Sequence, residues 1–193
     1  MKVKTLFTAM MLTGLFLSAS QILAQEGGQA EVMKKWQEAI TPGAAHQEFA
    51  KLAGNWKAAV TTYMGPQEAK AEATAQLEMV LGGRYLKSSF KGNMMGMPFE
   101  GLQLDAFDNV TKEYVSAWID NFGTGIMLLK GKKDEKTGEI VYLGTSADPM
   151  TGKMVTTKIV NKVIDNDHTT STMFMVENGQ DVKNMFIEYT RVK

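Results

Sequence analysis

From Gly54 onward, apolar and polar residues alternate along the chain with a period of two. Residues 71–79 give the clearest example, because alanine, leucine and methionine alternate there with glutamate, threonine and glutamine. A period of two places successive side chains on the two faces of a β-strand. The pattern therefore predicts a strand that starts at Gly54, and further strands at residues 71–79, 85–91, 99–107, 113–120, 125–130, 140–146, 154–164, 169–176 and 182–191.

Short turn sequences separate the predicted strands. Asn178-Gly179 is the strongest of them, because a type I′ hairpin turn needs positive φ at both central residues. No helix-length segment interrupts the series, so neighbouring strands are expected to pair antiparallel. About ten strands must close or split into two sheets to protect their edges. We expect a mainly β protein, a closed up-and-down antiparallel β-barrel of about ten strands, with a two-sheet sandwich as the alternative.

The segment before the strands has a helical period instead. Val32, Met33, Trp36 and Ile40 are spaced as on one face of an amphipathic helix. Thr41-Pro42 then suits the start of a second short helix that runs to about Leu52. Helices that pack on the barrel are the simpler interpretation, and a lid over a cavity is the alternative. The predicted domains are a helical arm at residues 25–44 and the barrel at residues 45–193.

The first 24 residues have the layout of a secretory signal peptide. Lys2 and Lys4 precede an apolar run at residues 6–17, and small residues follow. The run is about 12 residues long, whereas a membrane span needs roughly 20. We expect cleavage after Ala24, with Ser20 as the alternative, and a periplasmic or secreted product. The chain has no cysteine to carry a lipid, so no membrane anchor is expected.

Charge and cysteine content narrow the classes of function. The 193 residues include 21 basic and 21 acidic side chains, two histidines and no cysteine. Removal of residues 1–24 takes away Lys2 and Lys4 and leaves 19 basic against 21 acidic side chains, a net charge of −2. A slightly acidic chain gives no reason to expect nucleic acid as a partner. Without thiols there is no disulfide framework, zinc knuckle or cysteine nucleophile.

Several strings of residues, in order and spacing, resemble one bacterial family. They are Leu52-Ala-Gly-Asn-Trp56, Leu81-Gly-Gly-Arg-Tyr-Leu86, Gly96-Met-Pro-Phe-Glu-Gly101, Phe107-Asp108, Trp118-Ile-Asp120 and Glu188-Tyr-Thr-Arg191. Together they resemble the domain of unknown function 1579 family over roughly residues 45–193. The resemblance implies a lipocalin-like barrel of the calycin type and no established activity. Calycins close one end with a Gly-x-Trp at the first strand and an arginine from the last, which here implies structural closure by Trp56 and Arg191.

The leading hypothesis is an exported, non-enzymatic protein that binds a small apolar or amphipathic molecule inside the barrel. No cofactor is expected. The aromatic and methionine content favours such a lining. Alternation alone does not tell which strand face points inward. The candidate ligand-binding residues are Trp118, Phe99, Tyr85, Met127, Tyr142 and Met173, with Arg84 as a polar anchor.

Other functions remain open on the sequence. Carboxylates could serve acid–base chemistry, Glu100 with Asp105 or Asp108, and a barrel isomerase or hydrolase could use Arg84, Glu100 and Asp120. Haem could bind His168, and copper(I) could bind the methionines at residues 94, 95 and 97. An interaction protein with a filled barrel is a further alternative. A homodimer could form through the barrel seam or the helix that carries Trp36.

Overall fold

A computed structural model describes residues 28–94, 96–148 and 151–193. The predicted signal peptide and its cleavage sites lie outside these residues. Contacts divide the chain after Thr41 into two units, of which the second, residues 42–193, is the barrel unit.

The described part of the first unit is a helix over residues 28–40. Its Lys35 and Glu31 form an ion pair of 2.7 Å one turn apart. Val32, Met33 and Trp36 are exposed on it. Among the residues described, none of the helices has the length and apolarity needed to cross a membrane.

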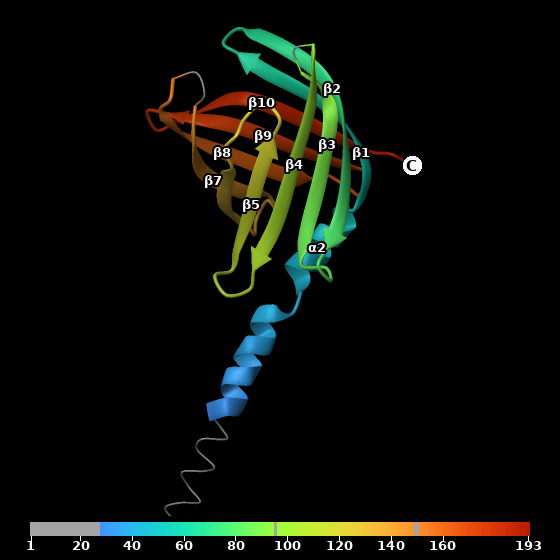
Figure 1. Ribbon diagram of the computed structural model, residues 1–193, viewed down its shortest axis with the longest axis vertical. Helices are drawn as coiled ribbons and strands as arrows, with labels where there is room; N and C mark the ends of the chain where they lie inside the picture. Colours follow the sequence, from blue (N-terminus) through green and yellow to red (C-terminus); the bar gives the residue numbers. More distant parts are fainter. Residues whose placement is uncertain (1–27, 95, 149–150) are drawn as a thin grey trace, which may run out of the picture. The chain divides into compact units, whose positions relative to one another are not determined.

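The second unit is a closed antiparallel barrel of ten strands, in which each strand pairs with its neighbours in sequence and the last pairs with the first (Figure 1). The expected mainly β, closed up-and-down barrel is therefore confirmed. Short hairpin loops account for this order, as at Asn178 and Gly179, which both have positive φ. The strands are β1 (Gly54–Met64), β2 (Gln67–Val80), β3 (Tyr85–Met94), β4 (Met97–Asp108), β5 (Glu113–Asp120), β6 (Met127–Lys133), β7 (Ile140–Ala147), β8 (Met154–Val163), β9 (His168–Glu177) and β10 (Gln180–Arg191).

Strand β2 begins four residues earlier than the alternation predicts. Met64 pairs with Gln67 there, so β1 and β2 continue as a hairpin beyond the apolar part of the pattern. Residues 67–70 are all exposed. Backbone pairing across the hairpin, and not burial of side chains, extends this strand, and hydrophobic periodicity does not detect that contribution.

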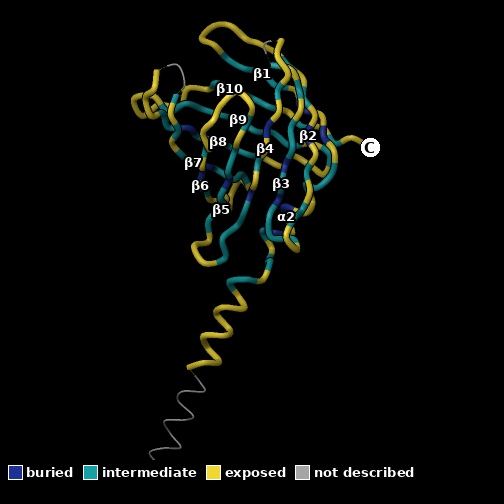
Figure 2. The backbone as a smooth tube through the Cα atoms, in the orientation of Figure 1, coloured by how far each residue is buried: buried dark blue, intermediate teal, exposed yellow. Residues whose placement is uncertain are grey.

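Helix α2 (Ala44–Leu52) packs against one end of the barrel. Phe49 is buried and meets Tyr114 edge-on with ring centroids 5.8 Å apart. At the start of the helix, the Gly43 N–H donates to His46 Nδ1 at 3.0 Å. Burial and the nearby Arg84 guanidinium lower the pKa of His46, which keeps the imidazole able to accept that bond. Figure 2 shows the buried residues of this end as dark segments on α2 and the adjoining strands.

Trp56 and Arg191 join the first strand to the last at the same end. They are paired neighbours across β1 and β10, and the guanidinium carbon lies 4.2 Å from the indole centroid. The Trp56 indole N–H donates to Leu52 O at 2.9 Å, and Arg191 donates to the carbonyls of Ala53 and Lys51 at 2.7 Å each. This contact stabilises α2 against the barrel through a cation–π pair and three hydrogen bonds.

Gly54 is required by the same contact. Its φ is +133°, and a Cβ at this position would lie 2.8 Å from Arg191 Nη1. The close approach of the arginine and the backbone conformation both favour glycine.

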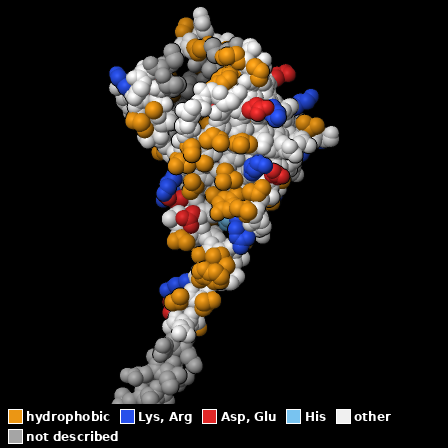
Figure 3. Space-filling view, in the orientation of Figure 1, with side chains coloured by type: hydrophobic (Ala, Val, Ile, Leu, Met, Phe, Trp, Pro, Cys, Tyr) orange, Lys and Arg blue, Asp and Glu red, His pale blue; other side chains and the backbone are white. Residues whose placement is uncertain are grey.

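Strand β4 reverses the usual pattern of polar and apolar faces. Gln103 and Asp105 point into the barrel, whereas Leu102 and Leu104 are 44% and 42% exposed on its outside. The outer apolar row continues onto β5, because Leu102 pairs with Ile119, which is also exposed. Figure 3 shows hydrophobic side chains gathered on the outer face over these strands.

Candidate functional site

The barrel contains a cavity of about 360 Å³ at the end where α2 packs. This volume lies at the lower end of the range for small-molecule sites. Apolar and aromatic side chains from seven different strands form much of its wall, among them Trp56, Leu77, Leu86, Tyr114, Tyr142, Ile159 and Tyr189. Phe49 of α2 also lines it. The space is thus enclosed by strands around most of the barrel and by the helix.

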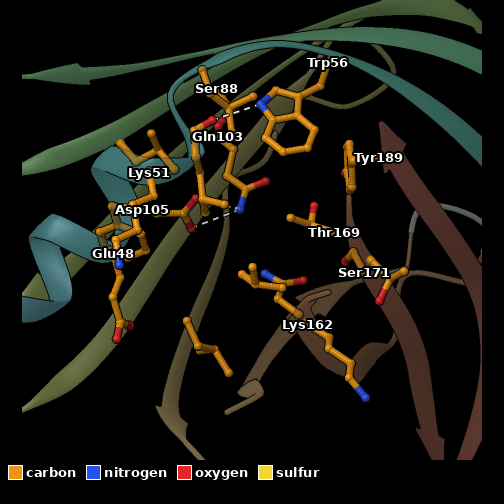
Figure 4. A pocket seen from close by; sticks show the side chains of 18 of the residues that line it. Glu48, Lys51, Trp56, Ser88, Gln103, Asp105, Lys162, Thr169, Ser171 and Tyr189 are labelled. Carbon is orange, nitrogen blue, oxygen red and sulfur yellow. Dashed lines mark hydrogen bonds between the residues drawn. The ribbon is translucent and has the colours of Figure 1, made fainter. Parts of the chain in front are cut away.

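Asp105 supplies the charge inside this apolar space. It is 6% exposed and is the only buried carboxyl group in the described part of the chain. The Gln103 side-chain amide lies 3.0 and 3.1 Å from the two carboxylate oxygens and 3.1 Å from Ser116 Oγ. Figure 4 shows Gln103 and Asp105 joined in this way on the cavity wall. Burial raises the pKa of Asp105 to about 6, although hydrogen bonds from Gln103 and Ser116 act in the opposite direction.

Two phenols lie within electrostatic reach of Asp105. Burial is the main cause that raises the pKa of Tyr142 and of Tyr189, and the Asp105 charge adds to it. Both phenols are therefore neutral wherever the protein is folded near neutral pH. They offer hydroxyl groups and aromatic faces to the cavity, and no charge.

A further polar group lines the cavity from β8. The Asn161 Oδ1 atom is buried and has no hydrogen-bond partner among the residues described. Asn161 is paired with Ile140 on β7 and with Ser171 on β9, and both neighbours line the cavity. A buried oxygen without a donor is uncommon in folded proteins and points to a group that the protein itself does not supply.

Charged side chains gather where the cavity meets α2 and the β6–β7 and β8–β9 turns. Lys133 binds both oxygens of Glu48 at 2.7 and 2.8 Å, and this pair is half-exposed. Lys51 of α2 and Asp165 of the β8–β9 turn also line this part. We place the mouth of the cavity here, because these charged groups remain in contact with solvent while Asp105 does not.

The sequence comparison decides the family. The model of the family described as "Protein of unknown function (DUF1579)" matches residues 41–191. The chain belongs to this family. The resemblance found in the sequence is therefore confirmed, and the DUF1579 match covers the whole barrel together with α2. Among curated proteins, none matches this chain.

Two solved structures share the DUF1579 barrel fold at low sequence identity. One, titled "Crystal Structure of Rv2717c from M. tuberculosis", has a TM-score of 0.59 and 14% identity, over 79% of this chain and 100% of that one. The other, titled "Structure of S-type Phycobiliprotein Lyase CPES from Guillardia theta", has a TM-score of 0.58 and 10% identity, over 81% of this chain and 96% of that one. At these identities the likeness shows the fold alone.

The structure distributes the expected ligand-binding residues of this DUF1579 protein over several places. Tyr142 lines the cavity. Trp118 shares the interior face, because it pairs with Gln103, and its indole covers Gly101 so closely that a Cβ there would lie 2.5 Å from it. Phe99 stacks on Trp118 at 6.2 Å. These two rings lie toward the barrel end away from α2.

Cross-strand pairing shows on which face of the barrel Met127 and Met173 lie. Met127 pairs with Trp118, and Met173 pairs with Ile159, so both are on the interior face beyond the cavity wall. Whether any of these residues contacts a ligand stays a prediction.

Tyr85 and Arg84 do not line the cavity, contrary to expectation. Tyr85 precedes Leu86, which faces inward, so the tyrosine lies on the outer face of β3. Arg84 belongs to the β2–β3 turn and donates to Leu81 O at 3.2 Å. Turn geometry therefore directs the arginine away from the interior.

The three residues of the enzymatic alternative are not brought together. Glu100 is exposed on the outer face of β4 and pairs with Lys91 at 3.4 Å. Asp120 accepts the Trp118 indole N–H at 2.7 Å and the Phe122 N–H at 2.9 Å. Arg84 lies at the opposite end of the strands from both, because Tyr85 pairs with Ala106 while Glu100 pairs with Lys91. The structure therefore does not bring Arg84, Glu100 and Asp120 into one site.

The residues considered for haem and metals lie at hairpin ends. His168 is exposed at the start of β9 and lies 2.9 Å from an Asp165 oxygen. Met94 and Met97 are paired at the β3–β4 turn, and residue 95 lies outside the described residues. Within the described ranges, no three histidine, aspartate or glutamate side chains are grouped so that they could hold a metal ion.

Sequence reasoning considered Asp105 only as a partner of Glu100 and did not propose Gln103 or Asn161. A Leu-Gln-Leu-Asp run by itself suggests that the leucines are buried, whereas alternation leaves the inward face of β4 open. A polar residue that alternates with leucine gives no indication of which face of the strand points into the barrel. The pairing of β4 with β3 and β5 decides it.

Proposed function

We propose that this protein binds a small amphipathic molecule in the cavity between α2 and the barrel wall. The observation that carries the proposal is a cavity of about 360 Å³, open at one end, with a mainly apolar wall and converging polar groups. Leu77, Leu86 and Ile159 supply surface for an apolar body, and Asp105 with Gln103 supplies a polar contact. The likeness to a protein titled a phycobiliprotein lyase supports the barrel fold but does not indicate which molecule this chain binds.

A dye that fluoresces in apolar surroundings tests the proposal. Uncharged N-phenyl-1-naphthylamine is expected to bind with increased fluorescence. Ser171→Trp places an indole in the cavity and is expected to abolish this increase, because Ser171 lines the cavity. Thr172→Trp is the matched control, since the next residue of β9 faces outward and its indole leaves the cavity free.

Circular dichroism and melting temperature verify that both variants fold. The proposal fails if the wild-type protein does not increase the fluorescence, or if Ser171→Trp binds the dye as well as Thr172→Trp does.

One observation favours an enzyme as the second candidate. A carboxyl group with a pKa of about 6 is suited to exchange protons near neutral pH. Its hydrogen-bond partners are the neutral side chains of Gln103 and Ser116. A carboxyl group that only binds a ligand needs no partners other than these neutral ones. Proton-transfer chemistry generally uses a second acid or base, so we favour binding over catalysis.

We further propose that the protein acts in the periplasm or after secretion, on the basis of the signal-like residues 1–24. An intact mass of the exported protein that lacks these residues would support export. A full-length chain retained in the cytoplasm would contradict it.

A further inference from the structure

We propose that the ligand carries a positively charged nitrogen, such as a primary amine, whose N–H groups bind the Asp105 carboxylate. This inference rests on the proposed binding function and specifies the polar end of the ligand.

The first argument is the unused acceptor capacity of Asp105. A carboxylate has about four lone-pair directions. The side chains of Gln103 and Ser116 donate to it, and both are neutral. A buried charge that lacks a countercharge is unfavourable, and a cation is the partner that compensates it.

The second argument is the orphaned oxygen of Asn161. In the barrel order β8 is separated from β4 by three strands, so Asn161 and Asp105 lie on nearly opposite walls of the same cavity. Both carry oxygen acceptors for which the described residues supply few donors or none. An ammonium group has three donors and no acceptor, and therefore complements such a pair of walls.

The third argument is the charge of the surroundings. The lysines that line the cavity lie near its mouth, where Lys133 binds Glu48 and Lys162 pairs with Glu139 at 3.4 Å, and Lys51 of α2 also lies at this end. Arg191 is held by backbone carbonyls over Trp56. Across the cavity from Asp105 the wall offers aromatic rings instead, of which Trp56 and Tyr189 are seen in Figure 4. Aromatic faces attract cations, so they favour an ammonium group over a carboxylate.

Three probes of similar shape test this inference by calorimetry at pH 8. They share a naphthyl group and differ in the polar end: 2-(1-naphthyl)ethylamine, 2-(1-naphthyl)ethanol and 1-naphthylacetate. The amine is expected to bind about tenfold or more tightly than the alcohol, as charge-assisted hydrogen bonds do relative to neutral ones. The carboxylate is expected to bind most weakly.

Two variants with the same change in net charge distinguish a direct contact with the Asp105 carboxylate from a general effect of the protein's charge on amine binding. Asp105→Asn is expected to lower the affinity for the amine to that for the alcohol, and to leave the alcohol within about twofold of wild type. Glu100→Gln removes an exposed carboxylate from the outer face of the same strand. It is expected to preserve the preference for the amine.

The pH dependence provides a second measurement. The affinity for the amine is expected to fall as the pH decreases through about 6, because protons compete for the carboxylate, while the affinity for the alcohol stays level. The phenols that share the cavity with Asp105, Tyr114, Tyr142 and Tyr189, have raised pKa values and remain neutral over this range. Glu48, Lys51 and Lys133 line the mouth of the cavity, away from this carboxyl group.

The outcomes distinguish the two proposals. If N-phenyl-1-naphthylamine binds but the amine probe does not, or binds no better than the alcohol or the carboxylate, the cationic ligand is refuted and the binding function stands. An amine preference that survives in Asp105→Asn also refutes it. If the dye does not bind either, the binding function itself fails.

Discussion

Asp105→Asn tests whether a buried carboxylate in the cavity opposes folding at neutral pH. The folded-state pKa of about 6 lies above the ordinary value of 3.8. Ionisation of Asp105 therefore favours the unfolded chain. The stability that its protonated form contributes is fully present below pH 3.8 and is lost as the pH rises through 6.

The size of the effect follows from the same two values. A pKa raised from 3.8 to about 6 corresponds to roughly 3 kcal/mol of stability once the group is fully ionised. At pH 4 only about 0.5 kcal/mol of this has been lost, so the stability of Asp105→Asn relative to wild type should increase by roughly 2.5 kcal/mol between pH 4 and pH 8. The constant cost of burying the amide cancels in this comparison, as do all other titrating groups that the two proteins share.

Urea unfolding followed by tryptophan fluorescence at pH 4, 5, 6, 7 and 8 measures this difference. Glu100→Gln serves as the control and should stay within about 0.5 kcal/mol of wild type throughout, as exposed substitutions do. A difference between Asp105→Asn and wild type that is constant with pH, or that shrinks as the pH rises, would show that Asp105 is not a destabilising buried charge.

Two further predictions concern the barrel itself. Trp56→Ala should lower the free energy of unfolding by about 3–5 kcal/mol, because a buried indole is lost, whereas Trp36→Ala, at a 54% exposed position, should leave the melting temperature unchanged. Equal melting curves for the two variants would refute the closure role of Trp56. Gly144→Ala should lower the free energy of unfolding by about 1–3 kcal/mol, because the new Cβ would lie 2.2 Å from Leu128 O. A Cβ at Gly125 meets no atom within 4 Å, so Gly125→Ala should leave the free energy of unfolding in chemical denaturation unchanged. A neutral Gly144→Ala would contradict the close strand packing.

Part of the site could be anticipated from the sequence, because it depends on the order of the strands and on the type of the residues. Trp56 and Arg191 stand at the two ends of the strand series, and an up-and-down barrel makes the first and last strands neighbours, which brings them into contact. Tyr142 is a large aromatic residue in a predicted strand, and it lines the cavity.

Other residues could not be assigned because their environment is supplied by distant segments. Tyr85 is aromatic and in a strand, but the pairing of Leu86 with Asp105 turns it outward. Asp105 is polar in sequence, yet Gln103 and Ser116 provide the hydrogen bonds that allow it to be buried. A polar side chain is stable inside a barrel only when partners meet it there. Here Gln103 lies two residues away on the same strand, and Ser116 lies opposite Asp105 on β5.

The sequence by itself determined the up-and-down order of the strands, because a period of two and short turns leave consecutive strands no arrangement other than antiparallel neighbours. The choice between a closed barrel and a two-sheet sandwich was made by the pairing of β1 with β10. The sequence also determined the family, through residues that recur in order along the whole barrel. Only the tertiary structure decided which face of β4 is the interior one, and therefore that the cavity contains a carboxylate and an unpaired amide oxygen. The physical reason is that alternation has two solutions for every strand, and the choice between them is made by ring closure and cross-strand pairing, neither of which is a local property of the chain.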